Sequence, residues 1–266
     1  MLKKLFMLAL LVFVLTSVQA EITVIVSEST KMILQDNDIR SLGEAQSGET
    51  IKLVIASASG FEGKEWQQVI VPQETLPASF TATDSKVGGK TLIAKIKVPL
   101  DASKDIYQFR ARALAADGSS ETVTLRLAVK EGLLLASLAQ PVKQTLVNQA
   151  VEFELTLINS SVADHKVRIS SNLPALWFTS QDVTVKAGEE KKVLLTIMPR
   201  VYGSKDVYFS ISSLENAETL DMIKANLDVE PVLKEKYGTA FYGFPFFTFS
   251  LLPYYLINSF ISLLLP

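Results

Sequence analysis

The chain has 266 residues, of which 48% are hydrophobic and 20% charged, and its formal net charge is −2. This length accommodates one or two domains, and the near-neutral charge without a basic run argues against nucleic acid as a partner. The chain contains no cysteine, which excludes disulfides, catalytic thiols, zinc–thiolate sites and lipid anchoring through cysteine.

The first twenty residues have the layout of a secretory signal peptide. Two lysines precede an uncharged apolar run at residues 5–14, and residues 18–20 (VQA) place small side chains where a signal peptidase cuts. We expect cleavage before Glu21, which leaves 24 basic and 28 acidic side chains and a formal charge of −4. The alternative is an uncleaved anchor helix, but the apolar run is shorter than the roughly 20 residues that a membrane span needs.

Residues 21–131 are predicted to form a first antiparallel β-sandwich. Apolar and polar residues alternate with a period of two, which places one face of each strand on a core and the other in water. The turn-forming pair Asp117-Gly118 predicts a hairpin between the last two strands. The strands expected on this basis are residues 22–26, 50–56, 90–98, 107–113 and 121–129.

Residues 132–229 are predicted to form a second sandwich of the same kind. The boundary between the two series of strands falls near residues 130–132, with almost no linker. Two sandwiches joined in this way usually form a semi-rigid rod. The expected strands are residues 133–137, 151–158, 166–170, 183–186, 192–198, 206–212 and 225–229.

Motifs in the second series carry a family resemblance. In chain order they are a strand ending in Asn (151–159, VEFELTLIN), a Trp after a Pro-containing loop (173–178, LPALWF), a turn (183–189, VTVKAGE) and an apolar strand (193–199, VLLTIMP). Residues 133–229 thereby resemble the CARDB-type or α-galactosidase-associated Ig-like domains of bacterial and archaeal surface proteins. The resemblance implies an Ig-like fold and a role in adhesion, spacing or presentation at the cell surface. It implies no catalytic residues.

The C-terminal segment predicts a membrane anchor. Residues 237–266 contain no charged side chain. As a helix, residues 241–265 would span about 37 Å, which is enough to cross a bilayer. We therefore expect a single-pass transmembrane helix at residues 241–266, preceded by a juxtamembrane stalk at residues 230–240. With the signal peptide removed, both domains would lie on the extracytoplasmic side of the cell membrane.

Four residues within this predicted span favour contact with protein over contact with lipid. Pro253 removes a helical hydrogen bond near the middle of the span, and Tyr254 and Tyr255 lie far from the interface that tyrosine prefers. Asn258 can bond to a backbone carbonyl or mark a contact with another membrane helix. A kinked span, a re-entrant hairpin and packing against a larger complex all stay open.

The sequence holds no recognisable catalytic, cofactor-binding or metal site. His165 is the single histidine and is predicted to lie in a solvated turn, so a multi-histidine metal site and a Ser–His–Asp triad are not expected. Asp36-Asn37-Asp38 has oxygen ligands at calcium-like spacing but lacks the later glycine and glutamate of an EF-hand loop. Asn159-Ser160-Ser161 is a glycosylation acceptor sequence, although its asparagine also suits the end of a strand.

The sequence therefore predicts a non-enzymatic, membrane-anchored protein whose Ig-like domains bind, adhere or act as spacers at the cell surface. Its expected partners are the lipid bilayer, through residues 241–266, and a protein at the surface or in the membrane. One alternative is an accessory subunit of a membrane complex for transport, secretion or glycan processing. Another is a carbohydrate-binding module, for which Trp66 in a polar stretch is the candidate contact, whereas Trp177 is expected in a core.

Overall fold

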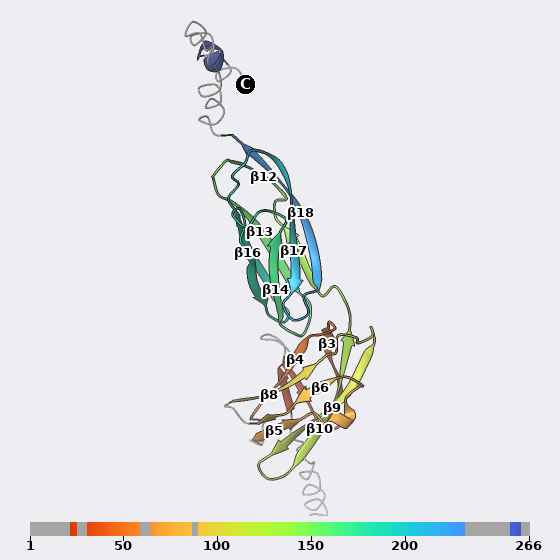
Figure 1. The fold of residues 1–266 in the computed structure, drawn as a ribbon. Helices are drawn as coiled ribbons and strands as arrows, with labels where there is room; N and C mark the ends of the chain where they lie inside the picture. The colour runs from red at the N-terminus through yellow and green to blue at the C-terminus, as the bar shows by residue number, and fades with distance from the viewer. Residues whose placement is uncertain (1–21, 26–30, 59–64, 87–89, 232–255, 262–266) are drawn as a thin grey trace, which may run out of the picture.

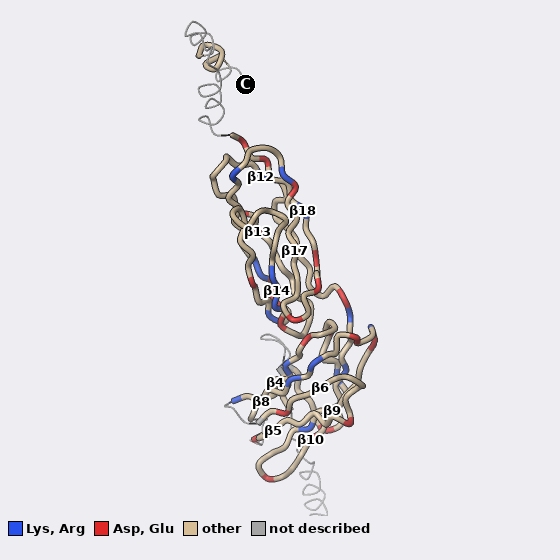
Figure 2. Tube along the Cα trace, in the orientation of Figure 1, with Lys and Arg blue, Asp and Glu red and all other residues tan. Residues whose placement is uncertain are grey.

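The computed structural model describes residues 22–25, 31–58, 65–86, 90–231 and 256–261 (Figure 1). Two β-sandwiches follow one another along the chain, the first built from strands β1–β10 and the second from strands β11–β18. The predicted all-β architecture of mainly antiparallel sheets is therefore confirmed. Basic and acidic residues are interspersed along both sandwiches (Figure 2).

The first sandwich consists of two five-stranded sheets, with the strand orders β2-β1-β4-β8-β6 and β3-β10-β9-β5-β7. Among its described strands, only β3 and β10 run parallel to each other. Its elements are β1 (Ile22–Ile25), β2 (Lys31–Leu34), β3 (Ile39–Ala45), β4 (Thr50–Ala56), β5 (Trp66–Ile70), the 3₁₀ helix η1 (Gln73–Thr75), β6 (Thr81–Thr83), β7 (Ser85–Lys86), β8 (Thr91–Lys97), β9 (Ile106–Ala115) and β10 (Ser120–Val129).

The second sandwich packs a three-stranded sheet, β11-β13-β16, on a five-stranded sheet, β12-β18-β17-β14-β15. Here β12 runs parallel to the last strand, β18. Its strands are β11 (Leu134–Leu138), β12 (Val142–Leu146), β13 (Val151–Asn159), β14 (His165–Ser171), β15 (Gln181–Val185), β16 (Glu190–Ile197), β17 (Gly203–Ser213) and β18 (Thr219–Glu230).

Period-two alternation of apolar residues produces both cores. In β4, Ile51, Leu53 and Ile55 are buried, whereas Lys52 between them is exposed. In the second core, the ring of Phe209 contacts the rings of Phe153 and Phe178 edge to face, at 5.7 and 5.8 Å between centroids. Each sandwich therefore has an apolar core of its own.

Two predicted turns are also confirmed. Gly118 has φ +82° in the hairpin that joins β9 to β10. Gly188 has φ +68° in the turn between β15 and β16, where the chain crosses from one sheet to the other. A left-handed backbone at these positions has little energetic cost for glycine because glycine lacks a Cβ atom.

The two sandwiches share the turn that links their parallel strand to the opposite sheet. In the first domain this turn joins β3 to β4, and Gly48 N donates to Pro99 O at 3.2 Å. In the second domain it joins β12 to β13, and Asn148 N donates to Pro199 O at 2.7 Å. The equivalent residues are 100 positions apart, and Gly48 and Asn148 both have positive φ. The second domain thus repeats the topology of the first, in which β2 and β6 are additional edge strands.

The predicted C-terminal transmembrane helix lies mostly outside the described residues. Residues 256–261 are helical, and within the described ranges no helix is long and apolar enough to cross a bilayer. Asn258 belongs to this short helix and is exposed. Pro253, Tyr254 and Tyr255 lie outside the described residues, as does the predicted signal peptide at residues 1–20.

Candidate functional site at the junction of the two domains

A loop of the second domain enters the first domain. This loop, residues 160–164 between β13 and β14, places Ala163 in the hydrophobic core of the first domain. Ala163 also forms an antiparallel bridge with Ile51 of β4, and Val162 N donates to Glu44 O at 2.9 Å. The two domains, which lie end to end in Figure 1, therefore share buried residues and backbone hydrogen bonds.

A glycine in β3 allows this close approach. Gly43 lies where the register between β3 and β10 shifts, and its φ is +125°. A Cβ atom added to Gly43 would lie 2.5 Å from Val162 Cγ1, closer than real Cβ contacts permit. Because the position requires both a positive φ and an empty Cβ site, only glycine suits it.

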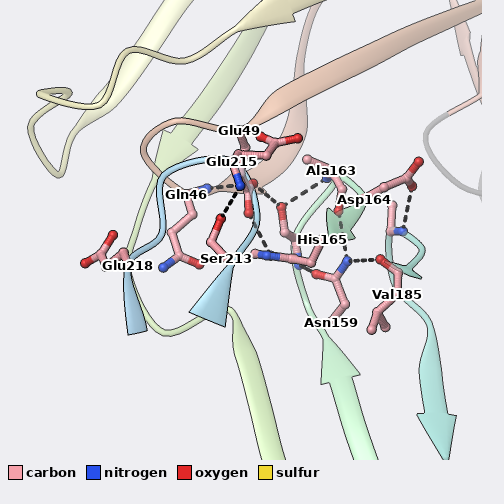
Figure 3. A network of polar contacts seen from close by, with 12 residues as sticks. Gln46, Glu49, Asn159, Ala163, Asp164, His165, Val185, Ser213, Glu215 and Glu218 are labelled. Atoms are coloured by element: carbon pink, nitrogen blue, oxygen red, sulfur yellow. Dashed lines mark hydrogen bonds and ion pairs between the residues drawn. The ribbon is translucent and has the colours of Figure 1, made fainter. Parts of the chain in front are cut away.

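A buried carboxylate and imidazole meet across the junction (Figure 3). Glu49 Oε1 lies 2.7 Å from His165 Nε2, and the two side chains are 8% and 5% exposed. Neither atom makes another hydrogen bond within the described part of the chain. Glu49 Oε2 accepts hydrogen bonds from Gln46 N, at 2.8 Å, and from the Ser161 hydroxyl, at 2.6 Å. A buried carboxylate needs such partners, and in this orientation of the domains Ser161 and His165 of the second domain supply two of them.

Asn159 shapes the inserted loop from inside the second domain. Its side-chain nitrogen lies 2.8, 3.2 and 2.9 Å from the carbonyl oxygens of Ala163, Val185 and Lys186. Its side-chain oxygen accepts a hydrogen bond from Ser161 N at 2.8 Å. Because Asn159 is buried and its amide is engaged by the fold, the glycosylation acceptor sequence is not accessible in this structure.

A partly exposed ion pair lies at the rim of the junction. Lys52 Nζ lies 2.5 Å from Asp164 Oδ2, and Ala187 N donates to Asp164 Oδ1 at 3.2 Å. Partial burial alone would raise the pKa of Asp164, but the hydrogen bonds from Lys52 and Ala187 and the charges of Lys52 and Lys186 outweigh that effect. The pKa of Asp164 therefore lies below its ordinary value of 3.8.

A shallow hollow of about 260 Å³, open to solvent, lies beside the Glu49–His165 pair. It is lined by Gln46, Ser47, Gly48 and Glu49 of the first domain and by His165, Ser213, Glu215, Asn216 and Leu220 of the second. Most of that volume is open solvent, and only about 20 Å³ of it is enclosed space that a water molecule could occupy, far too little for the ligand of a typical pocket. The described residues contain no group of three or more His, Asp or Glu side chains that could hold a metal ion.

The calcium-like triplet Asp36-Asn37-Asp38 forms a turn. Asp38 Oδ2 accepts a hydrogen bond from Gln35 N at 3.2 Å, and Asp36 Oδ1 accepts one from Thr122 N at 2.8 Å. Asn37 has φ +66° and binds Thr122 O through its backbone amide. These carboxylates therefore stabilise the turn between β2 and β3.

The prediction that His165 lies in a solvated turn is wrong. His165 is the first residue of β14, and the first domain covers its side chain. A period-two pattern describes one sheet at a time, so it contains no information on which turn a neighbouring domain buries. The available signal was the near absence of a linker at residues 130–132, which forces the ends of the two domains together.

Trp66, the candidate ligand contact, lies in the core of the first domain with 1% of its surface exposed. A ring closed into a core cannot stack on a surface sugar, so the carbohydrate-binding alternative loses the residue on which it depended. Trp177 is partly buried and packs against the core of the second domain. Neither tryptophan joins the junction between the domains.

No protein-family model and no curated protein sequence matches the chain. Similar solved structures include a chimeric titin Z1Z2 carrying a decorin peptide, at 13% identity and a TM-score of 0.34, covering 80% of this chain and 98% of that one. A Porphyromonas gingivalis W83 protein of unknown function has 12% identity, a TM-score of 0.29 and coverages of 69% and 93%. A metal-bound CARDB domain from Pyrococcus furiosus has 19% identity, a TM-score of 0.29 and coverages of 36% and 87%. Likenesses at this level do not define a function.

Proposed function

We propose that this chain is an exported, membrane-anchored, non-enzymatic protein whose two Ig-like domains form one stiff rod for spacing or presentation at the cell surface. The observation that carries the proposal is the junction, where Glu49 and His165 are buried together and Ala163 enters the core of the other domain. Domains on a flexible linker rotate freely, whereas these two can rotate only by exposing that network and that alanine. A fixed length and direction are what a spacer requires.

The path of the chain supports an upright rod. His165 lies at the junction, whereas β18 ends at Glu230, at the opposite end of the second domain (Figure 1). The uncharged residues 237–266 follow within a few positions, and residues 1–20 have the layout of a signal peptide. An anchor at residues 241–266 would therefore place the first domain farthest from the membrane.

The resemblance of residues 133–229 to CARDB-type domains belongs to the same proposal. Such domains present or space other modules at cell surfaces, which is the role that a closed junction supports. A protein partner would then meet the first domain or the sides of the rod, away from the bilayer.

Fractionation of cells that express the full chain tests export and anchoring. We expect a membrane-bound species that begins at Glu21 by mass and loses both domains to protease added outside the cell. Release by carbonate washing would contradict the anchor, and protection of both domains from the protease would contradict the proposed orientation.

A distance measurement tests the rod. Because the chain contains no cysteine, a double variant with Lys95→Cys in β8 and Thr196→Cys in β16 carries one nitroxide label in each domain. Both positions are exposed. We expect one narrow distribution of distances between the two labels in the full chain. A broad distribution would show that the domains reorient, and the spacer function would fail.

A further inference from the structure

The end of the second domain farthest from the junction is formed by three loops that are bonded to one another. They are residues 147–150 between β12 and β13, residues 172–180 between β14 and β15, and residues 198–202 between β16 and β17. Asn148 N donates to Pro199 O at 2.7 Å, and Met198 N donates to Trp177 O at 2.9 Å. The three loops therefore form one continuous surface.

This surface exposes large apolar side chains. Leu176 is 76% exposed, Tyr202 61% and Val201 53%, and Met198 and Leu146 are about two-fifths exposed. We call these five residues the apolar end. Single exposed apolar residues are ordinary, but here four lie on two bonded loops, with Leu146 at the adjoining end of β12, and together they form a patch of the kind that marks an interaction surface. Arg200, between Met198 and Val201, is exposed, as is Glu230, the register partner of Leu146. Lys143 and Lys205 lie three residues from Leu146 and Tyr202.

The chain itself indicates what covers the apolar end. Leu146 is the register partner of Glu230, the last residue of β18, so the chain leaves the domain at this surface. The uncharged stretch begins at Tyr237, seven residues later. The proposed anchor begins at residue 241, eleven residues after Glu230. Even fully extended, eleven residues reach at most about 40 Å, so a bilayer that holds the anchor lies within that distance of the apolar end.

We propose that the apolar end docks on the interfacial region of the lipid bilayer in which residues 241–266 are anchored, and this inference rests on the anchor proposed above. Leucine, valine and methionine side chains gain free energy by leaving water. Tyr202 adds an aromatic ring with a hydroxyl, the combination that prefers the membrane–water interface. The rod then stands on its second domain, with its direction fixed by contact with lipid as well as by the anchor.

Single nitroxide labels on the full chain test this contact in vesicles of phosphatidylcholine alone. Leu176→Cys and Val201→Cys place labels on the apolar end, and Leu194→Cys, which is 55% exposed on β16, is the matched control. We expect spectral broadening by oxygen and protection from an aqueous nickel complex at residues 176 and 201, with the reverse at residue 194. A double variant, Arg200→Ser with Tyr202→Ser, should reduce the protection at residue 176.

The other outcomes separate this inference from the proposed function. If the vesicles retain the chain but all three labels are equally accessible to nickel, the docking proposal is overturned and the anchor stands. If the chain does not enter vesicles at all, the anchor fails, and with it the basis for docking. Protection found only in native membranes, and absent in pure lipid, would assign the apolar end to a protein partner and overturn the lipid proposal.

Discussion

The same turn serves opposite purposes in the two domains. The turn at residues 46–49 of the first domain and the turn at residues 146–149 of the second both bind the carbonyl oxygen of an equivalent proline, at 3.2 and 2.7 Å. In the first turn, Glu49 is buried against the second domain. In the second turn, Gln149 is exposed beside Leu146 of the apolar end. The backbone of the turn is therefore generic, and its side chains decide whether a domain end forms a junction or stays open.

A third turn separates the local role of glutamate from the interdomain one. In the turn at residues 186–189, Glu189 Oε2 accepts a hydrogen bond from Lys186 N at 2.6 Å, as Glu49 Oε2 does from Gln46 N at 2.8 Å. Glu189, however, is only half-buried and meets no histidine. Closing the turn is thus a local property of a Gly-Glu pair, whereas burial of Glu49 is imposed by the neighbouring domain.

The largest effect is expected from Glu49→Ala. This change leaves His165 Nε2 buried without its partner and the Ser161 hydroxyl without its acceptor, which should lower the free energy of unfolding by about 2–4 kcal/mol. The matched control is Gln149→Ala in the equivalent exposed turn, which should change it by less than about 0.5 kcal/mol. Urea unfolding of both variants checks this, with the label distances between residues 95 and 196 as a second reading. Equal losses in the two variants would show that the turns matter only locally.

The next effect in size is expected from Gly43→Ala. An alanine there must adopt a left-handed backbone and push Val162 aside, so we expect a loss of about 2 kcal/mol and a broader distance between the domains. Gly188→Ala is the control, because its φ is also positive but no atom lies within 4 Å of the added Cβ. It should cost about 1 kcal/mol and leave the interdomain distance unchanged. An unchanged distance in Gly43→Ala would contradict the role given to this glycine.

A smaller effect is expected from Ser161→Ala. The hydroxyl of Ser161 donates to Glu49 across the junction and accepts from Ala163 N within the loop. Its removal should cost about 1–2 kcal/mol. Ser160→Ala is the neighbouring control, since this residue is exposed and its backbone amide, not its side chain, donates a hydrogen bond to Leu133 O. Thermal unfolding of the pair provides the measurement, and a larger shift for Ser160→Ala would refute the assignment.

The sequence predicted the strands that bury one face, because alternation is visible only there. The strand β4 alternates strictly and was predicted at its observed bounds. By contrast, β12 has no fully buried residue, and β3 contains the irregular register at Gly43, so neither was predicted. The junction was missed for a related reason. Glu49, Ser161 and His165 come from turns and strand ends that have no periodicity, and only the packing of two domains brings them together.

The smallest effect concerns pH at the rim of the junction. The pKa of Asp164 is lowered below 3.8 in the folded chain, so its ion pair with Lys52 stabilises the fold fully at pH values above 3.8. This stabilisation is lost as the pH falls through the lower pKa of the folded chain. Asp164→Asn should therefore be slightly less stable than the natural chain at neutral pH and should lose less stability on acidification.

The matched control is Asp182→Asn, because the pKa of Asp182 is also lowered, by its hydrogen bonds from Arg168, but both partners belong to the second domain. Acid should widen the distance between labels 95 and 196 in the natural chain and in Asp182→Asn, whereas in Asp164→Asn the distance should already be slightly wider at neutral pH. If acidification leaves that distance unchanged in all three chains, the rim pair does not contribute to holding the domains together, and the buried network alone fixes the rod.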